Sequence, residues 1–363
     1  MSVTEVYVDS SIGADSGAGT IGDPYGRLSY AFTQSSSTTN GKRYNVKGTT
    51  LASPETSFGT PPAGSSSSKP VYIQGYTTVA GDGGTLFVDG GGSAIVTDTN
   101  KDGVHCINCH FKNYGSSWAF SLDNNCSFIN CTFDGGGTGH GVDADSYFYV
   151  YNCFFTNIRN KVYKSAGTGK FCYNTVHVTV IDADTYLFQE AMAFIGNRIR
   201  IDQSVDVAFL ANAYRASVIA YNSIKGVRGS RRDKGIYLQA SAVVRSNYLE
   251  GFEEALDLNG PSLISGNVFF NNDSNLLEGS KACNLCDPVV GVNSTTLSAT
   301  GLPGLLDSAS LDFTPSVELR DVLAANDWNR DAPALTTGME QHFGAVLNVH
   351  QQTEGYRRKL RTF

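Results

Sequence analysis

The chain has few charged residues and no long apolar run, and both absences narrow its class. Asp, Glu, Lys and Arg make up 17% of the 363 residues, against about a quarter in typical soluble proteins. No apolar run reaches roughly 18 residues, the minimum for a transmembrane helix. The formal net charge of −7 disfavours a nucleic-acid-binding domain, because such domains are normally basic. We therefore expect neither membrane insertion nor a nucleic-acid partner.

A secretory signal is also missing from the start of the sequence. Residues 1–5 provide neither a basic segment nor an apolar one. This favours a protein made in a cytoplasm, for example a virion protein in its host. A truncated chain would look the same and would leave an extracellular location open.

Glycine and aromatic residues are abundant, with 39 Gly, 20 Phe and 18 Tyr, a mixture typical of β structure with many turns. Eight positions recur at intervals of 20 to 25 residues and form a column: Cys109, Cys131, Cys153, Asn174, Asn197, Asn222, Asn247 and Asn267. Apolar residues stand three positions before and two positions after each member, with one further cysteine, Cys106, among them. The segments alternate apolar and polar residues, which indicates strands rather than helices.

This repeat predicts an all-β fold, a single-stranded right-handed parallel β-helix in which each coil stacks on the previous one. The column is expected at a bend, where Asn tolerates unusual backbone angles and its amide bonds along the stack. Cysteine is small enough to fill the same place. For the three column cysteines we favour a reduced structural ladder over disulfides or a metal site.

The ends of the chain depart from the repeat. We expect an N-terminal cap and Ser/Gly-rich loop over 1–70, the β-helix over 71–287, and a C-terminal cap with an irregular basic tail over 288–363. Asp23-Pro24 has the pattern of a helix start, and Tyr25, Leu28 and Phe32 would form its apolar face. Such a helix would close the open end of the stack.

On these residues, the chain resembles the right-handed parallel β-helix repeat proteins of the pectin-lyase-like group. Residues 7–9 and 22–25 are similar to that group's N-terminal cap, and residues 129–133 and 264–269 to its typical coil. The resemblance implies the fold. It implies no single function, because the group contains polysaccharide lyases, glycoside hydrolases, phage tailspikes, other virion proteins and adhesins.

Three aspartates are candidate catalytic residues. Asp123 and Asp145 both stand eight positions before a column residue, so they should stack about one strand spacing apart. Asp143 would share the face of Asp145, and Gln189 occupies the matching place further along. Two such carboxylates could share a calcium ion or act as an acid and a nucleophile. We favour the interpretation that these residues form a polar ladder on a solvated strand and that the protein has no cofactor. Calcium would be expected only if the protein is a lyase.

Other motifs are weaker. Gly139-His140-Gly141 matches a short polygalacturonase motif, but no paired aspartates precede it and Arg198-Ile199-Arg200 lies too far along. Cys283-Asn284-Leu285-Cys286 is half a zinc site by spacing; a local disulfide or two free thiols fits better, and the sequence does not decide between them. The six histidines show no metal-ligand spacing.

A basic loop at residues 225–234 carries candidate binding residues: Arg228, Arg231, Arg232 and Lys234. They could grip an anionic glycan or supply a lyase base. They could equally form a solvated loop or dock an acidic partner.

Three functions remain open. The first, which we favour, is a non-enzymatic structural or attachment protein of a phage virion, either a head decoration or a tail fibre or spike component. Its partners would be other virion proteins or cell-surface polysaccharide, and a homotrimer is compatible with it. The second is a polysaccharide lyase or glycoside hydrolase acting on an anionic polysaccharide. The third is a bacterial surface adhesin.

Overall fold

A computed structural model gives the fold of the chain in two compact units, Met1–Lys170 and Phe171–Phe363, which are described separately. The structure describes residues 3–12, 15–34, 41–56, 58–62, 69–96, 101–181, 186–203, 207–211, 217–227, 233–239, 242–245, 247–258, 262–265, 267–270, 272, 274–277, 285–286, 305–307 and 312–315. The only helix among them is one of seven residues. No helix of this described part is long and apolar enough to cross a bilayer.

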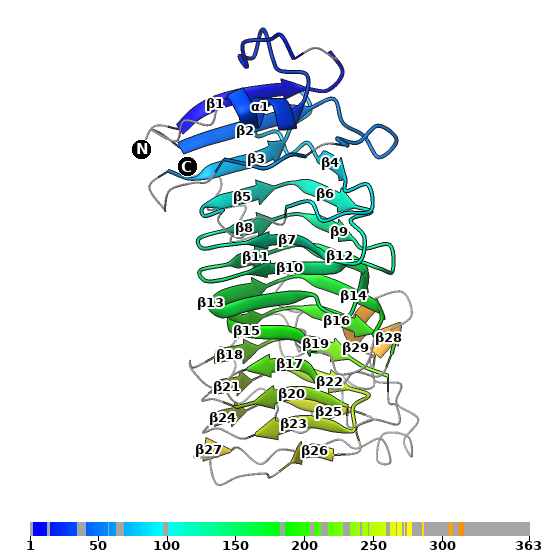
Figure 1. Ribbon diagram of the computed structural model, residues 1–363. Coiled ribbons are helices and arrows are strands. Elements are labelled where there is room, and N and C mark those ends of the chain that lie inside the picture. The colour runs from blue at the N-terminus through cyan, green and yellow to red at the C-terminus, as the bar shows by residue number, and fades with distance from the viewer. Residues whose placement is uncertain are drawn as a thin grey trace, which may run out of the picture. The chain divides into compact units, whose positions relative to one another are not determined.

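The first unit is a parallel β-solenoid with three series of stacked strands (Figure 1). One series runs through β1 (Val3–Asp9), β2 (Gly41–Lys47), β3 (Val71–Gly75), β5 (Val104–Ile107), β8 (Ser127–Ile129) and β11 (Tyr149–Tyr151). A second runs through β4 (Leu86–Asp89), β6 (Cys109–Lys112), β9 (Thr132–Asp134) and β12 (Phe154–Arg159). The third runs through β7 (Trp118–Leu122), β10 (His140–Ala144) and β13 (Tyr163–Cys172).

The second unit repeats this arrangement of parallel stacked strands. One series is β14 (Thr175–Val180), β16 (Arg198–Ile201), β19 (Ser223–Lys225), β22 (Tyr248–Glu250) and β25 (Val268–Phe270). From β15 (Tyr186–Ile195) two series continue: β17 (Val207–Ala211), β20 (Lys234–Leu238), β23 (Glu254–Leu258) and β26 (Ser274–Leu277), and β18 (Ser217–Ala220), β21 (Ala242–Arg245), β24 (Ser262–Ser265) and β27 (Leu285–Cys286). β28 (Leu305–Asp307) and β29 (Asp312–Pro315) form an antiparallel pair. The stacked coils of both units confirm the predicted parallel β-solenoid.

The interior is built from files of equivalent side chains, as the repeat requires. Phe111, Phe133 and Phe155 are register partners on β6, β9 and β12 and are fully buried. The rings of Phe133 and Phe155 stack with centroids 4.7 Å apart and planes 8° apart. Because inward residues alternate with outward ones along each strand, one apolar residue per coil adds to each file.

The predicted cap helix is confirmed, but its predicted start at Asp23-Pro24 is wrong. The helix α1 covers Leu28–Gln34. Asp23 instead pairs with Thr20, and Tyr25 forms a parallel bridge with Val8. These bonds to neighbouring extended segments give hydrogen-bond partners to backbone groups, whereas a helix start would leave its first N–H groups without partners. Phe32 of α1 is buried and packs against Tyr44 of β2, with ring centroids 4.8 Å apart.

Column residues point inward at a bend between strand series. Cys109, Cys131 and Cys153 are buried thiols that form no disulfide. Sγ of Cys131 lies 3.5 Å from the carbonyl oxygen of Cys106, and Sγ of Cys153 lies 3.5 Å from that of Phe128, so each thiol contacts the preceding coil. From Asn174 to Asn267, consecutive asparagines are joined by side-chain hydrogen bonds of 2.9 to 3.2 Å.

The unusual backbone angle lies one residue before the column rather than on it. Asn108, Asn130 and Asn152 have φ of 54°, 54° and 52°, in the left-handed region that Asn tolerates. They turn the chain, which lets the column residue keep an inward side chain. Their amides form a second, outer ladder, in which Asn152 donates to Asn130 at 2.8 Å and Asn130 to Asn108 at 3.2 Å.

Candidate functional site

The β7–β10–β13 series in the first unit carries one of the candidate aspartates in an ion pair. Ser121, Asp143 and Lys164 are register partners on the three strands. Oδ2 of Asp143 lies 3.2 Å from Nζ of Lys164, and the two side chains are 19% and 45% exposed. Burial raises the pKa of Asp143, and the charge of Lys164 partly offsets this. Asp143 is thus a paired carboxylate at the surface.

Asp123 and Asp145 follow β7 and β10 directly and lie side by side, as their spacing predicts. Partial burial, followed by the negative charges of Asp102 and Asp145, raises the pKa of Asp123. Asn124 donates a hydrogen bond to Asp123. Within the described residues, no group of three or more His, Cys, Asp or Glu side chains is arranged to hold a metal ion. Asp102 and Asp145 thus place two negative charges near Asp123.

Trp118 and His140 complete this surface, and sequence reasoning did not bring them together. They are register partners on β7 and β10, with ring centroids 5.6 Å apart in an edge contact. Nδ1 of His140 lies 2.6 Å from the carbonyl oxygen of Arg159. A carbonyl can only accept, so Nδ1 carries the proton and Nε2 is the acceptor of the neutral ring.

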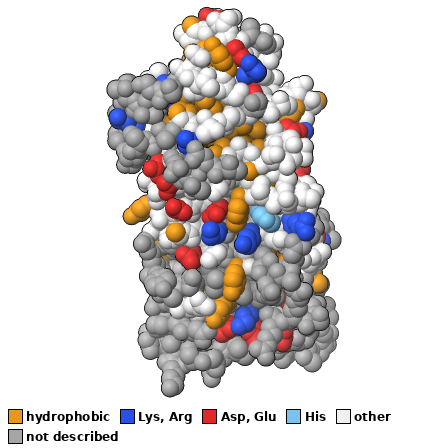
Figure 2. Space-filling model, viewed as in Figure 1, with side chains coloured by type: hydrophobic (Ala, Val, Ile, Leu, Met, Phe, Trp, Pro, Cys, Tyr) orange, Lys and Arg blue, Asp and Glu red, His pale blue; other side chains and the backbone are white. Residues whose placement is uncertain are grey.

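We call this surface the front face and define it by Trp118, Ser121, His140, Asp143 and Lys164. Figure 2 shows it over β7, β10 and β13, where histidine, basic, acidic and apolar side chains lie next to one another. Lys161 is exposed beside the front face. Its positive charge adds to that of Lys164 in lowering the pKa of Asp143, against the effect of burial.

The glycines of Gly139-His140-Gly141 have a packing role. A Cβ on Gly139 would lie 2.4 Å from the ring of Tyr114, and one on Gly141 would lie 1.9 Å from the carbonyl oxygen of Val162. Only glycine allows these close approaches. The motif is therefore explained by coil packing, without reference to catalysis. Arg200 of the distant Arg198-Ile199-Arg200 stretch is engaged elsewhere, bonding Asp202 at 2.6 Å.

Of the four predicted basic binding residues, Arg228, Arg231 and Arg232 lie outside the described residues. Lys234 begins β20 in the second unit and pairs with Asp257 and, at 3.4 Å, with Glu254. Its Nζ also lies 4.6 Å from the ring centroid of Tyr237. Burial lowers the pKa of Lys234, but the hydrogen bond to Asp257 and the negative charge of Asp257 outweigh burial and raise this pKa above its ordinary value. These bonds tie Lys234 to its own sheet. Cys283 also lies outside the described residues, and of Cys286 only the strand is described.

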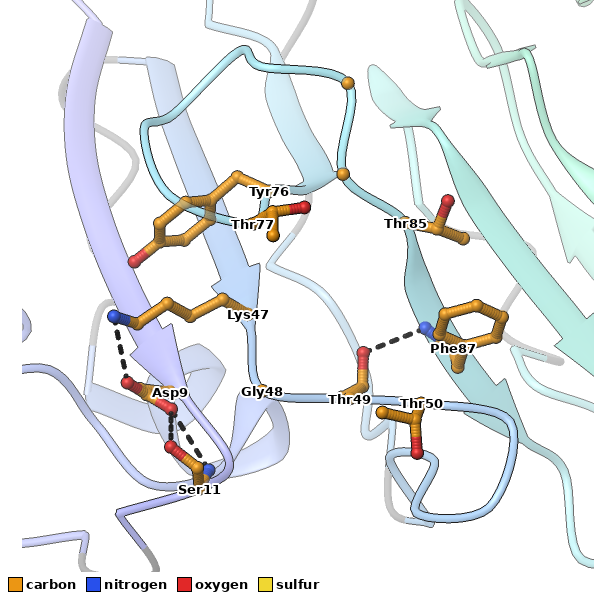
Figure 3. Close-up of a pocket in the computed structure, with 12 residues that line it drawn as sticks. Asp9, Ser11, Lys47, Gly48, Thr49, Thr50, Tyr76, Thr77, Thr85 and Phe87 are labelled. Atoms are coloured by element: carbon orange, nitrogen blue, oxygen red, sulfur yellow. Dashed lines mark hydrogen bonds and ion pairs between the residues drawn. The ribbon is translucent and has the colours of Figure 1, made fainter.

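A pocket of about 600 Å³ opens in the first unit where β1, β2 and β3 end (Figure 3). Asp9, Lys47 and Tyr76 form one wall, residues 48–50 form the floor, and Thr85 and Phe87 form the opposite wall. Lys47 pairs with Asp9 at 3.2 Å. Sequence reasoning missed this pocket because its residues come from irregular early coils with no shared spacing.

No protein-family model, curated protein or solved structure matches the chain.

Proposed function

We propose that the chain is a non-enzymatic attachment protein that binds an acidic cell-surface polysaccharide through the front face. The observation that supports this best is the register of β7, β10 and β13, which sets Trp118 against His140 and Asp143 against Lys164. A glycan needs an apolar platform for its C–H faces and polar groups for its hydroxyls. Trp118 provides the first, and the His140, Asp143 and Lys164 side chains provide the second.

The solenoid suits an extended ligand. Successive strands of the series lie about 4.8 Å apart, so side chains of the front face are presented as closely spaced rows on an open surface. Lys161 and Lys164 would meet the carboxylates of a uronate-containing chain. Surface charges of this kind favour binding that weakens as salt increases.

The proposed setting is a phage virion, as a head decoration or a tail fibre or spike component, with other virion proteins as further partners and a homotrimer as one assembly. The stacked backbone supports this proposal. Nearly every strand of the described coils is hydrogen-bonded to a neighbouring coil, and such continuous pairing resists local opening and proteolysis.

The test is binding to purified polysaccharides. Wild-type protein and the Trp118→Ala variant are titrated with pectate, alginate and bacterial capsular glycans at low and high salt. We expect one acidic glycan to bind the wild type and to lose about tenfold in affinity with the variant, the loss of one aromatic contact. Tyr147→Ala is the matched control, since Tyr147 is 52% exposed and lies outside the front face. Equal affinities of the wild type and the Trp118 variant would overturn the proposal.

A second candidate, an enzyme acting on an anionic polysaccharide, is favoured by Asp123. Its raised pKa beside Asp145 is a property of catalytic acids. The same glycans, incubated with and without calcium, would then give unsaturated products for a lyase or new reducing ends for a hydrolase. Product formation that Asp123→Asn abolishes would establish the enzyme and displace the attachment role.

A further inference from the structure

We propose that the pocket at the ends of β1, β2 and β3 binds a neutral pyranose ring. This site is separate from the front face and does not depend on the proposed function. Its volume of about 600 Å³ lies in the range of natural ligand pockets. Its lining combines two aromatic rings with one ion pair and several threonines.

The polar wall offers a donor and an acceptor without net charge. Asp9 accepts hydrogen bonds from the backbone N of Ser11 at 3.0 Å and from its hydroxyl at 2.5 Å. Its other oxygen lies 3.2 Å from Nζ of Lys47. Although burial acts in the opposite direction, these bonds lower the pKa of Asp9, so its carboxylate stays ionised at neutral pH. An adjacent carboxylate and ammonium match two neighbouring sugar hydroxyls, and the pair has no net charge with which to attract an anionic ligand.

The opposite wall carries the aromatic ring of Phe87. Figure 3 shows the Phe87 ring across the floor from Lys47 and Tyr76. The hydroxyl of Thr49 accepts from the backbone N of Phe87 at 3.0 Å and fixes that wall to the floor. Thr77 and Thr85 add hydroxyls to the lining. A pyranose presents apolar C–H faces and polar edges, which is the pattern that these two walls complement.

The pocket is held in shape by local bonds. Gly48 has φ +82°, and a Cβ there would lie 2.8 Å from Oδ1 of Asp9. The Asp82 carboxylate accepts from the backbone N of Thr77, Thr78, Val79 and Gly84 at 2.6 to 3.1 Å. These bonds hold the pKa of Asp82 well below its usual range and fix the loop whose residues Thr77, Gly83 and Gly84 line the pocket. A pre-formed site loses little conformational entropy on binding.

The experiment is saturation-transfer NMR on the full chain with the methyl glycosides of glucose, galactose and mannose, and with methyl glucuronide as the anionic probe. We expect transfer from aromatic protons to at least one neutral glycoside. In the Trp118→Ala variant, which removes the apolar platform of the front face, transfer to the glucuronide should be weaker than transfer to that glycoside. The variants Phe87→Ala and Lys47→Gln should each weaken the affinity about tenfold. If the Phe87 variant is unstable, Lys47→Gln still tests whether the pocket binds the glycoside.

Tyr147→Ala is the control, because Tyr147 is 52% exposed and lies outside both the pocket and the front face. It should not change glycoside binding. Repeating the glucuronide measurement with Trp118→Ala separates binding at the pocket from binding at the front face. Absence of transfer to every neutral glycoside, preference for the glucuronide in the Trp118→Ala variant, or unchanged binding in both pocket variants would overturn the proposal.

Discussion

The side-chain amide of Asn222 donates to Oδ1 of Asn247 at 2.9 Å, although the two residues are 25 positions apart. The same oxygen accepts from the backbone N of Asn222 at 3.0 Å. In the same way, Oδ1 of Asn222 accepts hydrogen bonds from the backbone N and the Nδ2 of Asn197. Nδ2 of Asn222 also donates to the carbonyl oxygen of Phe194 at 2.8 Å. Each asparagine therefore closes its own bend and binds the adjacent coils.

Asn222→Ala should strongly destabilise the second unit. The change leaves the backbone N of Asn197 and the carbonyl of Phe194 buried without these partners, at about 1–3 kcal/mol for each group. We expect a loss of about 3 kcal/mol in the free energy of unfolding, measured by urea denaturation. Val227→Ala, at a residue 46% exposed, should change it by less than about 0.5 kcal/mol. Equal effects of the two substitutions would contradict the ladder.

Phe133→Ala should cost the first unit about 3–5 kcal/mol, because its ring is fully buried between those of Phe111 and Phe155. The adjacent coil supplies the matched control. Phe154 is 37% exposed, and Phe154→Ala should cost a small fraction of that amount. The unfolding free energies of the two variants measure the difference. Similar losses would show that the alternation of inward and outward residues is wrong.

Six cysteines should resist thiol reagents in the native protein: Cys106, Cys109, Cys126, Cys131, Cys153 and Cys172. All six side chains are buried and closed to reagents. Burial also raises the pKa of Cys126 to about 12 and the pKa of Cys109 and Cys153 well above the ordinary value, so the reactive thiolate of these three is scarce at neutral pH. Alkylation followed by peptide mapping should label all six only after denaturation. Rapid native labelling of Cys153, or its recovery in a disulfide, would contradict the buried ladder.

Stability should fall between weakly acidic and neutral pH because of Glu55. This side chain is buried beside the start of α1, and burial raises its pKa to about 7 from 4.5. The folded state therefore holds the proton more tightly. The contribution of Glu55 to the free energy of unfolding is complete below about pH 4.5 and is lost as the pH rises through about 7. The loss is at most about 3 kcal/mol.

Glu55→Gln tests this dependence. Unfolding free energies of the wild type and the variant are compared at about pH 5 and about pH 8. The wild type should lose more stability than the variant between the two values. An identical loss in both proteins would assign the pH dependence to other groups.

The repeat made most of the fold predictable. Phe111, Phe133 and Phe155 recur at a fixed spacing, and in a solenoid a fixed spacing becomes a spatial file. The start of α1 was not predictable in the same way. Asp23 has a strong local preference for a helix start, but long-range pairing with the neighbouring extended segments overrides it.

The candidate site was predictable in part. The spacing of Asp123 and Asp145 gave their stacking, but the ion pair of Asp143 with Lys164 required the observed register. Trp118 and His140 share the 22-residue spacing of Asp123 and Asp145, so the repeat could have predicted their stacking; the pair was missed because its two residues differ in type. The pocket depends on Asp9, Lys47 and Phe87, which come from early coils of unequal length.

The central claim is that coils in register bring residues 22 positions apart into contact on the front face. A double-mutant cycle with Trp118→Ala and His140→Ala, measured as unfolding free energy, tests it most directly. The edge contact of the two rings predicts a coupling of about 0.5–1.5 kcal/mol. Effects that add within about 0.3 kcal/mol would contradict the register and the front face that rests on it.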